Sequence, residues 1–112
     1  MSALRAPLAV SVEIRVPDER GRRAFRLTAA AGEDGLRLET PAPFDVGRPV
    51  EVAFRLPDDP EPFALRAVIE LGEDDGEGEH GGSELAFEGA GAEARARLNR
   101  YVADRLGLPP LA

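Results

Sequence analysis

The sequence LAVSVEIRV, residues 8–16, alternates large apolar side chains with small or polar ones. Because successive side chains of a strand point to opposite faces, this period of two predicts a strand with one buried face. The turn-forming segment 17–21, PDERG, then ends that strand. The predicted inward residues are Leu8, Val10, Val12, Ile14 and Val16.

The same alternation returns, with varying strength, in five later segments that are separated by Gly-rich or Pro-rich connections. Each is short enough for a strand of a small sheet, and the connections supply the turns. The segments are 23–29, 36–39, 50–56, 63–71 and 85–87. Their expected inward residues are Phe25, Leu27, Leu36, Leu38, Val50, Val52, Phe54, Leu56, Phe63, Leu65, Ala67, Ile69, Leu71, Leu85 and Phe87.

The period changes near the C-terminus, between Ala92 and Leu106. Apolar residues there recur at spacings of three and four, which is one face of an amphipathic helix. Gly107 suits the left-handed position just after such a helix, and the prolines that follow prevent its continuation. The apolar face comprises Ala94, Leu98, Tyr101, Val102 and Leu106.

Six short strands and one closing helix predict a mainly β domain, either a small antiparallel barrel or a sandwich. The chain has 112 residues, of which 43% are hydrophobic, so a single domain with a modest core is expected. We expect this domain to span residues 1–107 and residues 108–112 to form a short tail.

The formal net charge is −7, and all 14 basic residues are Arg. An acidic domain is repelled by nucleic acid polymers and by anionic lipid, so we expect neither as a partner. The absence of Cys excludes a thiolate nucleophile and a Cys-ligated zinc site. No apolar stretch is long enough for membrane insertion or for a signal peptide, so the expected location is cytoplasmic.

Three short motifs resemble known binding or catalytic motifs but lack the context, partner or spacing that the chemistry requires. We therefore expect no enzyme and no metal site. The sequence GEGEHG, residues 76–81, has the GxGxxG pattern, but a strand follows it and two carboxylates lie inside it. His80 lies near Ser83 in this Gly-rich connection, without a residue to orient it. The acidic runs in 58–61 and 73–75 lack the spacing of a calcium loop.

The densest basic run spans residues 20–26. Within it, Arg22 and Arg26 would lie on one face of a strand, where guanidinium groups can hold phosphate through paired hydrogen bonds. We favour the alternative, a solvated outer face paired with acids such as Glu13 or Glu39.

Four stretches together resemble the PilZ domain, a bacterial receptor for cyclic di-GMP. They are RAPLAVSVEIRV (5–16), GEDGLRLETPAPFDVGRPVEVAFRLP (32–57), FALRAVIEL (63–71) and ELAFEGAGAEARARLNRYVADRL (84–106). The resemblance implies a six-stranded antiparallel β-barrel with one C-terminal α-helix. It also implies a non-enzymatic role in bacterial signalling.

The family binds its nucleotide with an RxxxR segment and a [D/N]xSxxG segment, and this sequence departs from both. Arg5 falls on the second Arg, whereas Met1 stands where the first would be. In the second motif Ala30 replaces Asp or Asn, Gly32 replaces Ser, and only Gly35 is kept. Each lost contact to a charged group is worth about 1.5–3 kcal/mol, so we expect weak or no cyclic di-GMP binding.

Two hypotheses follow from the resemblance. In the first, the chain is an adaptor that acts through protein contacts, for example in motility or type IV pili, and needs no cofactor. In the second, it is a genuine cyclic di-GMP receptor that uses Arg5, Gly32 and Gly35 with Arg22 and Arg26. The eroded motifs favour the first. The sequence leaves the protein partner unidentified and leaves monomer and dimer equally open.

Overall fold

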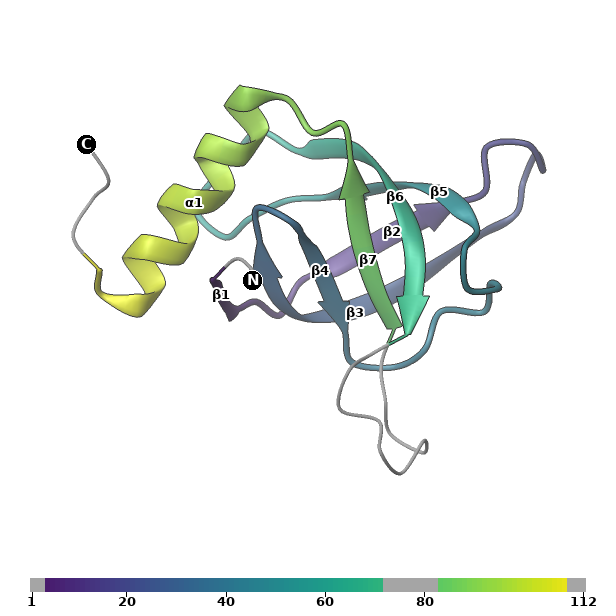
Figure 1. Ribbon diagram of the computed structural model, residues 1–112, viewed down its shortest axis with the longest axis horizontal. Coiled ribbons are helices and arrows are strands. Elements are labelled where there is room, and N and C mark those ends of the chain that lie inside the picture. The colour runs from purple at the N-terminus through teal and green to yellow at the C-terminus, as the bar shows by residue number, and fades with distance from the viewer. Residues whose placement is uncertain (1–3, 72–82, 109–112) are drawn as a thin grey trace.

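The fold was analysed in a computed structural model that describes residues 4–71 and 83–108. Within these ranges there are seven strands and one helix, shown in Figure 1. The elements are β1 (Arg5–Pro7), β2 (Ser11–Arg15), β3 (Arg23–Gly32), β4 (Gly35–Leu38), β5 (Pro49–Phe54), β6 (Phe63–Leu71), β7 (Ser83–Glu88) and α1 (Ala92–Leu106).

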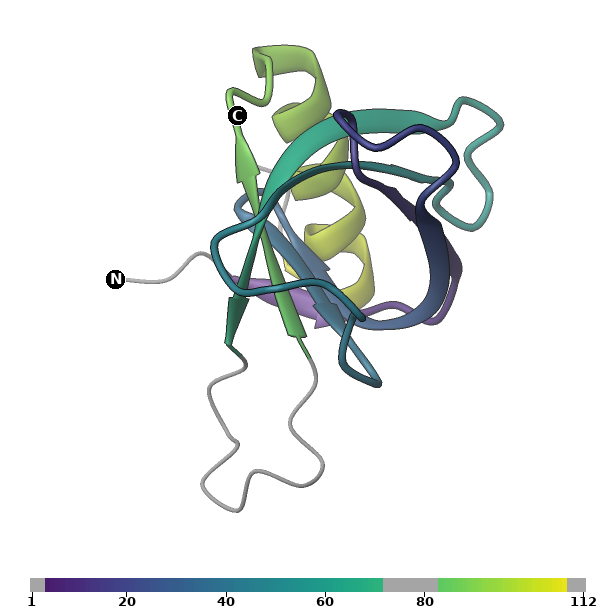
Figure 2. The same cartoon turned by 90° about the vertical axis from the view of Figure 1, so that its right-hand side faces the viewer.

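Six of these strands close into an antiparallel barrel, with α1 packed against one side (Figures 1 and 2). Each neighbouring pair is antiparallel, in the cyclic order β2, β3, β4, β7, β6, β5. Closure depends on the long strand β3, whose first half pairs with β2 and whose second half pairs with β4. The predicted six-stranded barrel with one C-terminal helix is therefore confirmed.

Only part of the predicted first strand, 8–16, is a strand: β2 begins at Ser11, and residues 8–10 form a kink between β1 and β2. β1 lies before the predicted range and pairs with the end of β3, whereas β2 pairs with the beginning of β3. Thr28 lies at the break and is fully buried. Its Oγ1 accepts the N–H of Val10 at 2.9 Å and donates to the carbonyl oxygen of Leu8 at 2.8 Å. One hydroxyl thus replaces ladder hydrogen bonds that the kink removes.

Thr28→Val is expected to lower the free energy of unfolding by about 1–3 kcal/mol, because it leaves a buried donor and acceptor without their partner. Urea denaturation followed by circular dichroism measures the change. The matched control is Thr40→Val at an exposed threonine, which should change stability by less than about 0.5 kcal/mol. Equal effects of the two substitutions would show that the Thr28 hydroxyl does not stabilise the kink.

The barrel interior contains most of the residues that the alternation placed there. Leu65, Phe87 and Val10 are only partly buried but pack against this core, and the side chain of Leu71 lies outside the described residues. The buried members are Leu8, Val12, Ile14, Val16, Leu36, Leu38, Val50, Val52, Phe54, Leu56, Phe63, Ala67, Ile69 and Leu85.

The prediction that Phe25 and Leu27 face inward was wrong: they are 55% and 48% exposed. The pairing of β2 with β3 sets Ala24 opposite Ile14, and Arg26 opposite Val12. Directly opposed residues of an antiparallel pair share a face, so the inward residues of this half of β3 are Ala24 and Arg26. A difference of one residue in register moves every side chain to the other face.

Helix α1 begins and ends where its sequence pattern predicts, and it packs against β1 and β3. Leu98 and Val102 are buried, and the Tyr101 hydroxyl donates to the carbonyl oxygen of Pro7 at 2.7 Å. Gly107 adopts the predicted left-handed conformation, with φ of 71°. Leu106 differs from the prediction, because it lies at the end of the helix and is 40% exposed. No helix within the described ranges is long and apolar enough to cross a membrane.

Candidate functional site

The pairing of β1, β3 and β4 brings together three of the five residues predicted to bind nucleotide. Arg5 of β1 pairs with Gly32 at the end of β3, and Gly32 pairs in turn with Gly35 at the start of β4. Glu33 and Asp34 form the turn between the two glycines. Arg5 therefore lies beside the turn that replaces the family's second motif.

The guanidinium of Arg5 is held by two carboxylates. Its Nε donates to Oδ1 of Asp34 at 3.2 Å, and its Nη1 lies 2.8 Å from both carboxylate oxygens of Glu84 on β7. The Arg5 and Glu84 side chains are only 22% and 14% exposed. A second cation, Arg37, places its Nε 3.9 Å from Glu84 Oε2. We refer to Arg5, Asp34 and Glu84 as the Arg5 cluster.

Partial burial tends to lower the pKa of Arg5, but the hydrogen bonds to Asp34 and Glu84 outweigh it and leave the pKa raised. Arginine is charged at any physiological pH in either case. The direction of the shift shows that the two carboxylates more than compensate for the water that the guanidinium has lost.

Gly32 and Gly35 are required because a Cβ atom would clash with neighbouring atoms, and not because the backbone has a conformation that favours glycine. A Cβ atom on Gly35 would lie 2.2 Å from the carbonyl oxygen of Leu85 and 3.2 Å from Nη2 of Arg5. A Cβ atom on Gly32 would lie 2.5 Å from the carbonyl oxygen of Leu4 and 2.9 Å from Cγ of Arg5. Gly32 stands where the family motif has Ser. Its lack of a side chain leaves room for the backbone of Leu4 and the side chain of Arg5.

Arg22 and Arg26 do not join the Arg5 cluster. Arg22 lies just before the first residue of β3, whereas Arg5 pairs with the last. Arg22 donates to Oε1 of Glu19 at 2.9 Å and lies over the ring of Phe44, 5.1 Å from its centroid. Arg26 donates to the carbonyl oxygens of Pro41 at 3.0 Å and of Phe25 at 2.8 Å. The second hypothesis would therefore need one ligand to reach both ends of β3.

A recess of about 260 Å³ adjoins the Arg5 cluster. Its lining includes the carboxylates of Glu33 and Asp34, the ring of Phe87 and the guanidinium of Arg95. Glu33 accepts a hydrogen bond from Nδ2 of Asn99 on the helix at 2.8 Å. Two carboxylates and one guanidinium thus border the space next to Arg5, and the net negative charge of this lining opposes a phosphate there.

Several other motif residues lie elsewhere or outside the described residues. The segment 76–81 with His80 and the acidic run 73–75 are outside them. Ser83 is buried, and its Oγ accepts the N–H of Ala42 at 2.9 Å. In the other acidic run, Asp59 accepts hydrogen bonds from Arg97 at 2.8 Å and from the N–H of Glu61 at 3.0 Å.

Glu84 is the residue of the site that the sequence did not indicate. It sits opposite Arg37 in the pairing of β4 with β7, far along the chain from Arg5. Its neighbours in sequence show only a short alternating strand, and nothing local marks it as a partner of an arginine.

The fold and the site define a small barrel domain with a lateral helix and an arginine-centred cluster at the junction of β1, β3 and β4. The family model of the PilZ domain matches residues 2–104, and the chain belongs to this family.

Two solved structures have a similar fold, each with 17% sequence identity to this chain. One is the Bacillus subtilis inhibitor of motility MotI/DgrA, with a TM-score of 0.74 and 95% of this chain covered. This chain spans only 51% of that protein. The other is the PilZ domain of CeSA from a cellulose-synthesizing bacterium, with a TM-score of 0.59, 94% of this chain covered and 97% of that domain. No curated protein sequence matches the chain.

Proposed function

We propose that this chain is a non-enzymatic PilZ regulatory domain with weak or no cyclic di-GMP binding, which acts through contacts with a protein partner. The observation that carries the proposal is the state of Arg5, the residue that matches the second arginine of the family motif. Its Nε and Nη1 donors are already used by Asp34 and Glu84.

A phosphate that makes two hydrogen bonds to Arg5 needs Nε or Nη1 as well as Nη2, so it would have to displace at least one of these carboxylates. Hydrogen bonds that involve a charged group are worth about 1.5–3 kcal/mol each, so displacement cancels much of what the phosphate would gain. The displaced carboxylate would remain near the phosphate and repel it. Met1 replaces the motif's first arginine, which removes a further cation that could compensate.

The output of such a domain would then be a protein contact rather than a response to the nucleotide. One of the similar structures is an inhibitor of motility, which supports motility as an output to test first, with type IV pili as the next. A location in the cytoplasm is part of this proposal and rests on membership of the PilZ family.

Calorimetric titration with cyclic di-GMP at low salt tests the proposal directly. We expect no saturable binding with a Kd below about 1 mM. A PilZ receptor with both motifs intact, titrated from the same stock, shows that the ligand is active.

Micromolar binding would contradict the proposal, and two variants would then locate the site. Loss of binding in Arg5→Ala would assign it to the Arg5 cluster, and loss in Arg22→Ala would assign it to the other end of β3. Circular dichroism on both variants separates lost binding from lost structure.

A further inference from the structure

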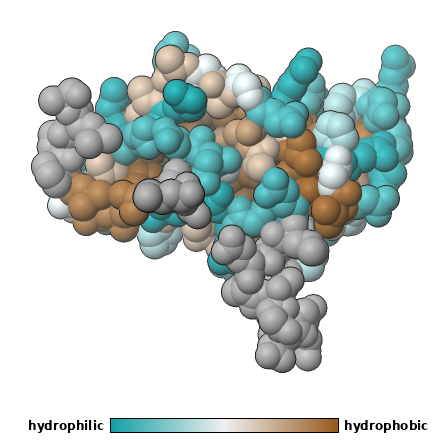
Figure 3. Space-filling model, in the orientation of Figure 1, coloured by the Kyte–Doolittle hydropathy of each residue, from teal (hydrophilic) through white to brown (hydrophobic). Residues whose placement is uncertain are grey.

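Two pairs of large apolar residues that are close together in sequence are exposed on the described surface. Leu106 and Leu108 form one pair, at the C-terminal end of α1, where Figure 3 shows an apolar patch. Phe25 and Leu27 form the other, on the outer face of β3, and they are the more exposed of the two pairs. Because the second pair lies within a strand of a closed sheet, its two side chains are held in fixed positions on one face.

The strands beside β3 leave Phe25 and Leu27 uncovered. In the register of β2 with β3, Glu13 lies opposite Phe25 and Ser11 lies opposite Leu27. On the next strand, β5, Ala53 lies opposite Glu13. Directly opposed residues share a face, so only short side chains and one carboxylate lie across the sheet from the apolar pair. An aromatic ring and a leucine therefore stand out from this face.

A recess of about 420 Å³ adjoins this pair at the turn between β2 and β3, which lies at the end of the barrel away from α1 (Figure 1). Arg23 connects the recess with the pair, because its guanidinium lies over the ring of Phe25, 5.8 Å from the centroid. We call the recess together with Phe25 and Leu27 the hairpin surface. Four guanidinium groups and two carboxylates line the recess, from Arg15, Arg20, Arg22, Arg23, Glu19 and Glu51.

The two carboxylates of the recess, and two more beside it, are each bound to a guanidinium. Arg20 is the one guanidinium of the recess that has no hydrogen bond, ion pair or ring contact among residues 4–71 and 83–108. The hairpin surface thus has an uncompensated positive charge, on a chain with a formal net charge of −7. The ion pairs are Arg15–Glu51, Arg22–Glu19, Arg23–Glu13, Arg48–Asp18 and Arg48–Glu19.

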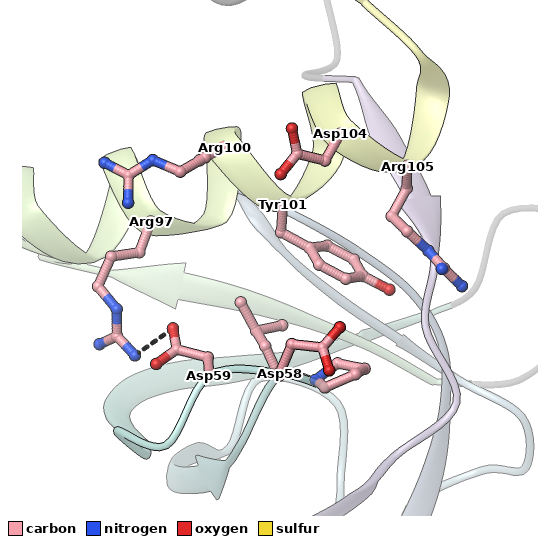
Figure 4. Close-up of a pocket in the computed structure, with 9 residues that line it drawn as sticks. Asp58, Asp59, Arg97, Arg100, Tyr101, Asp104 and Arg105 are labelled. Carbon is pink, nitrogen blue, oxygen red and sulfur yellow. Dashed lines mark hydrogen bonds and ion pairs between the residues drawn. The ribbon is translucent and has the colours of Figure 1, made fainter.

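The recess between α1 and the turn after β5, drawn in Figure 4, differs in this respect. There Arg97 donates to Asp59 at 2.8 Å, and Arg105 lies over the ring of Tyr101, 5.8 Å from its centroid. The hydrogen bond from Arg97, with smaller contributions that include the charge of Arg100, lowers the pKa of Asp59. The guanidinium groups of that recess are thus used within the protein.

We propose that the hairpin surface binds a segment of a protein partner that carries carboxylates beside an apolar side chain. The inference rests on the proposed function, in which the output is a protein contact. Carboxylates of the partner bind Arg20, and they can replace Glu51 on Arg15 at little cost, because exposed ion pairs contribute only about 0–1 kcal/mol. Phe25 and Leu27 then lose their contact with water, which favours association.

A phosphate group fits the hairpin surface less well than such a segment. Three of the four guanidinium groups of the recess are already paired with carboxylates, and a phosphate would leave Phe25 and Leu27 in contact with water. A nucleic acid polymer would also be repelled by the negative charge of the rest of the chain. An acidic segment with an apolar side chain uses both parts of the surface.

Selection on the full chain from a phage-displayed library of random peptides, each of about twelve residues, tests this inference. Peptides enriched on the wild-type protein should carry Asp or Glu beside Leu, Ile, Phe or Trp. Their Kd, measured by fluorescence anisotropy, should be below about 1 mM. Two double variants remove the two parts of the surface separately: Arg20→Glu with Arg23→Gln, and Phe25→Thr with Leu27→Thr. Each should weaken binding by about tenfold or more.

The controls are double variants on α1 and just after it. Arg100→Glu with Arg105→Gln changes the net charge by the same amount, and Leu106→Gln with Leu108→Gln removes two exposed apolar side chains elsewhere. Both should keep the affinity within about twofold, because distant sites act independently. Circular dichroism checks that all variants are folded.

Three results would overturn the inference: no enrichment, enriched peptides without acidic residues, or binding that survives both variants of the hairpin surface. None of them concerns the nucleotide. Calorimetric binding of cyclic di-GMP would instead contradict the proposed function, so the two failures can be told apart.

Discussion

Gly35→Ala is expected to lower the free energy of unfolding by about 3 kcal/mol or more. The added methyl group would lie 2.2 Å from the carbonyl oxygen of Leu85, an atom of the neighbouring backbone on β7. A flexible side chain could rotate away at little cost, but a backbone carbonyl in the β4–β7 ladder cannot move without loss of the pairing. The substitution therefore weakens the barrel at the β4–β7 pair.

Urea denaturation measures this loss, and the fraction of soluble protein with a native circular dichroism spectrum covers the case of a variant that does not fold. Gly91→Ala is the matched control, because a Cβ atom there would meet nothing within 4 Å. Gly91 also has φ of −72°, which alanine adopts without strain. We expect the control to change stability by no more than about 1 kcal/mol, because Gly91 is the N-cap of α1 and Ala is less favourable than Gly at that position. Similar stabilities of the two variants would show that β4 and β7 can separate to admit a methyl group.

Strong alternation in the sequence was enough to predict most of the barrel. In β5, for example, Val50, Val52 and Phe54 are all buried, because a strand with large apolar residues at every second position has only one stable orientation. In β3 the two faces of the strand differ less clearly in hydrophobicity. Phe25 and Leu27 are more hydrophobic than Ala24 and Arg26, yet the pairing with β2 places the latter pair inward. Arg26 is half-buried, and its guanidinium reaches exposed backbone carbonyls of Pro41 and Phe25. A local pattern does not contain that information.

The sequence predicted the place of the Arg5 cluster better than its contacts. Alignment with the family motifs put Arg5, Gly32 and Gly35 in one group, and strand pairing does bring them together. The alignment did not show that Asp34 binds Arg5 directly, or that Glu84 joins from β7, because both contacts depend on pairing between distant segments.

A double-mutant cycle measures how strongly Arg5 is bound within the protein. Arg5→Met keeps an apolar side chain of moderate length but removes the charge, and Glu84→Gln removes the opposite charge with little change in shape. Arg5→Met alone should lower the free energy of unfolding by about 2–4 kcal/mol, because Glu84 is then left largely buried beside Asp34. In the double variant part of this penalty disappears, so we expect a coupling energy of about 1–3 kcal/mol. Urea denaturation of the wild type, both single variants and the double variant supplies the four values.

The exposed cross-strand pair Arg15 and Glu51 provides the control cycle, with Arg15→Met and Glu51→Gln. These side chains are 53% and 42% exposed and 3.4 Å apart, so water screens the pair and the coupling should stay below about 1 kcal/mol. If the Arg5 cycle gives no more than this, the carboxylates do not retain the guanidinium, and a phosphate could displace them at little cost. Strong coupling would have the opposite meaning, because a ligand would then have to overcome this energy before it could form a paired hydrogen-bond contact with Arg5.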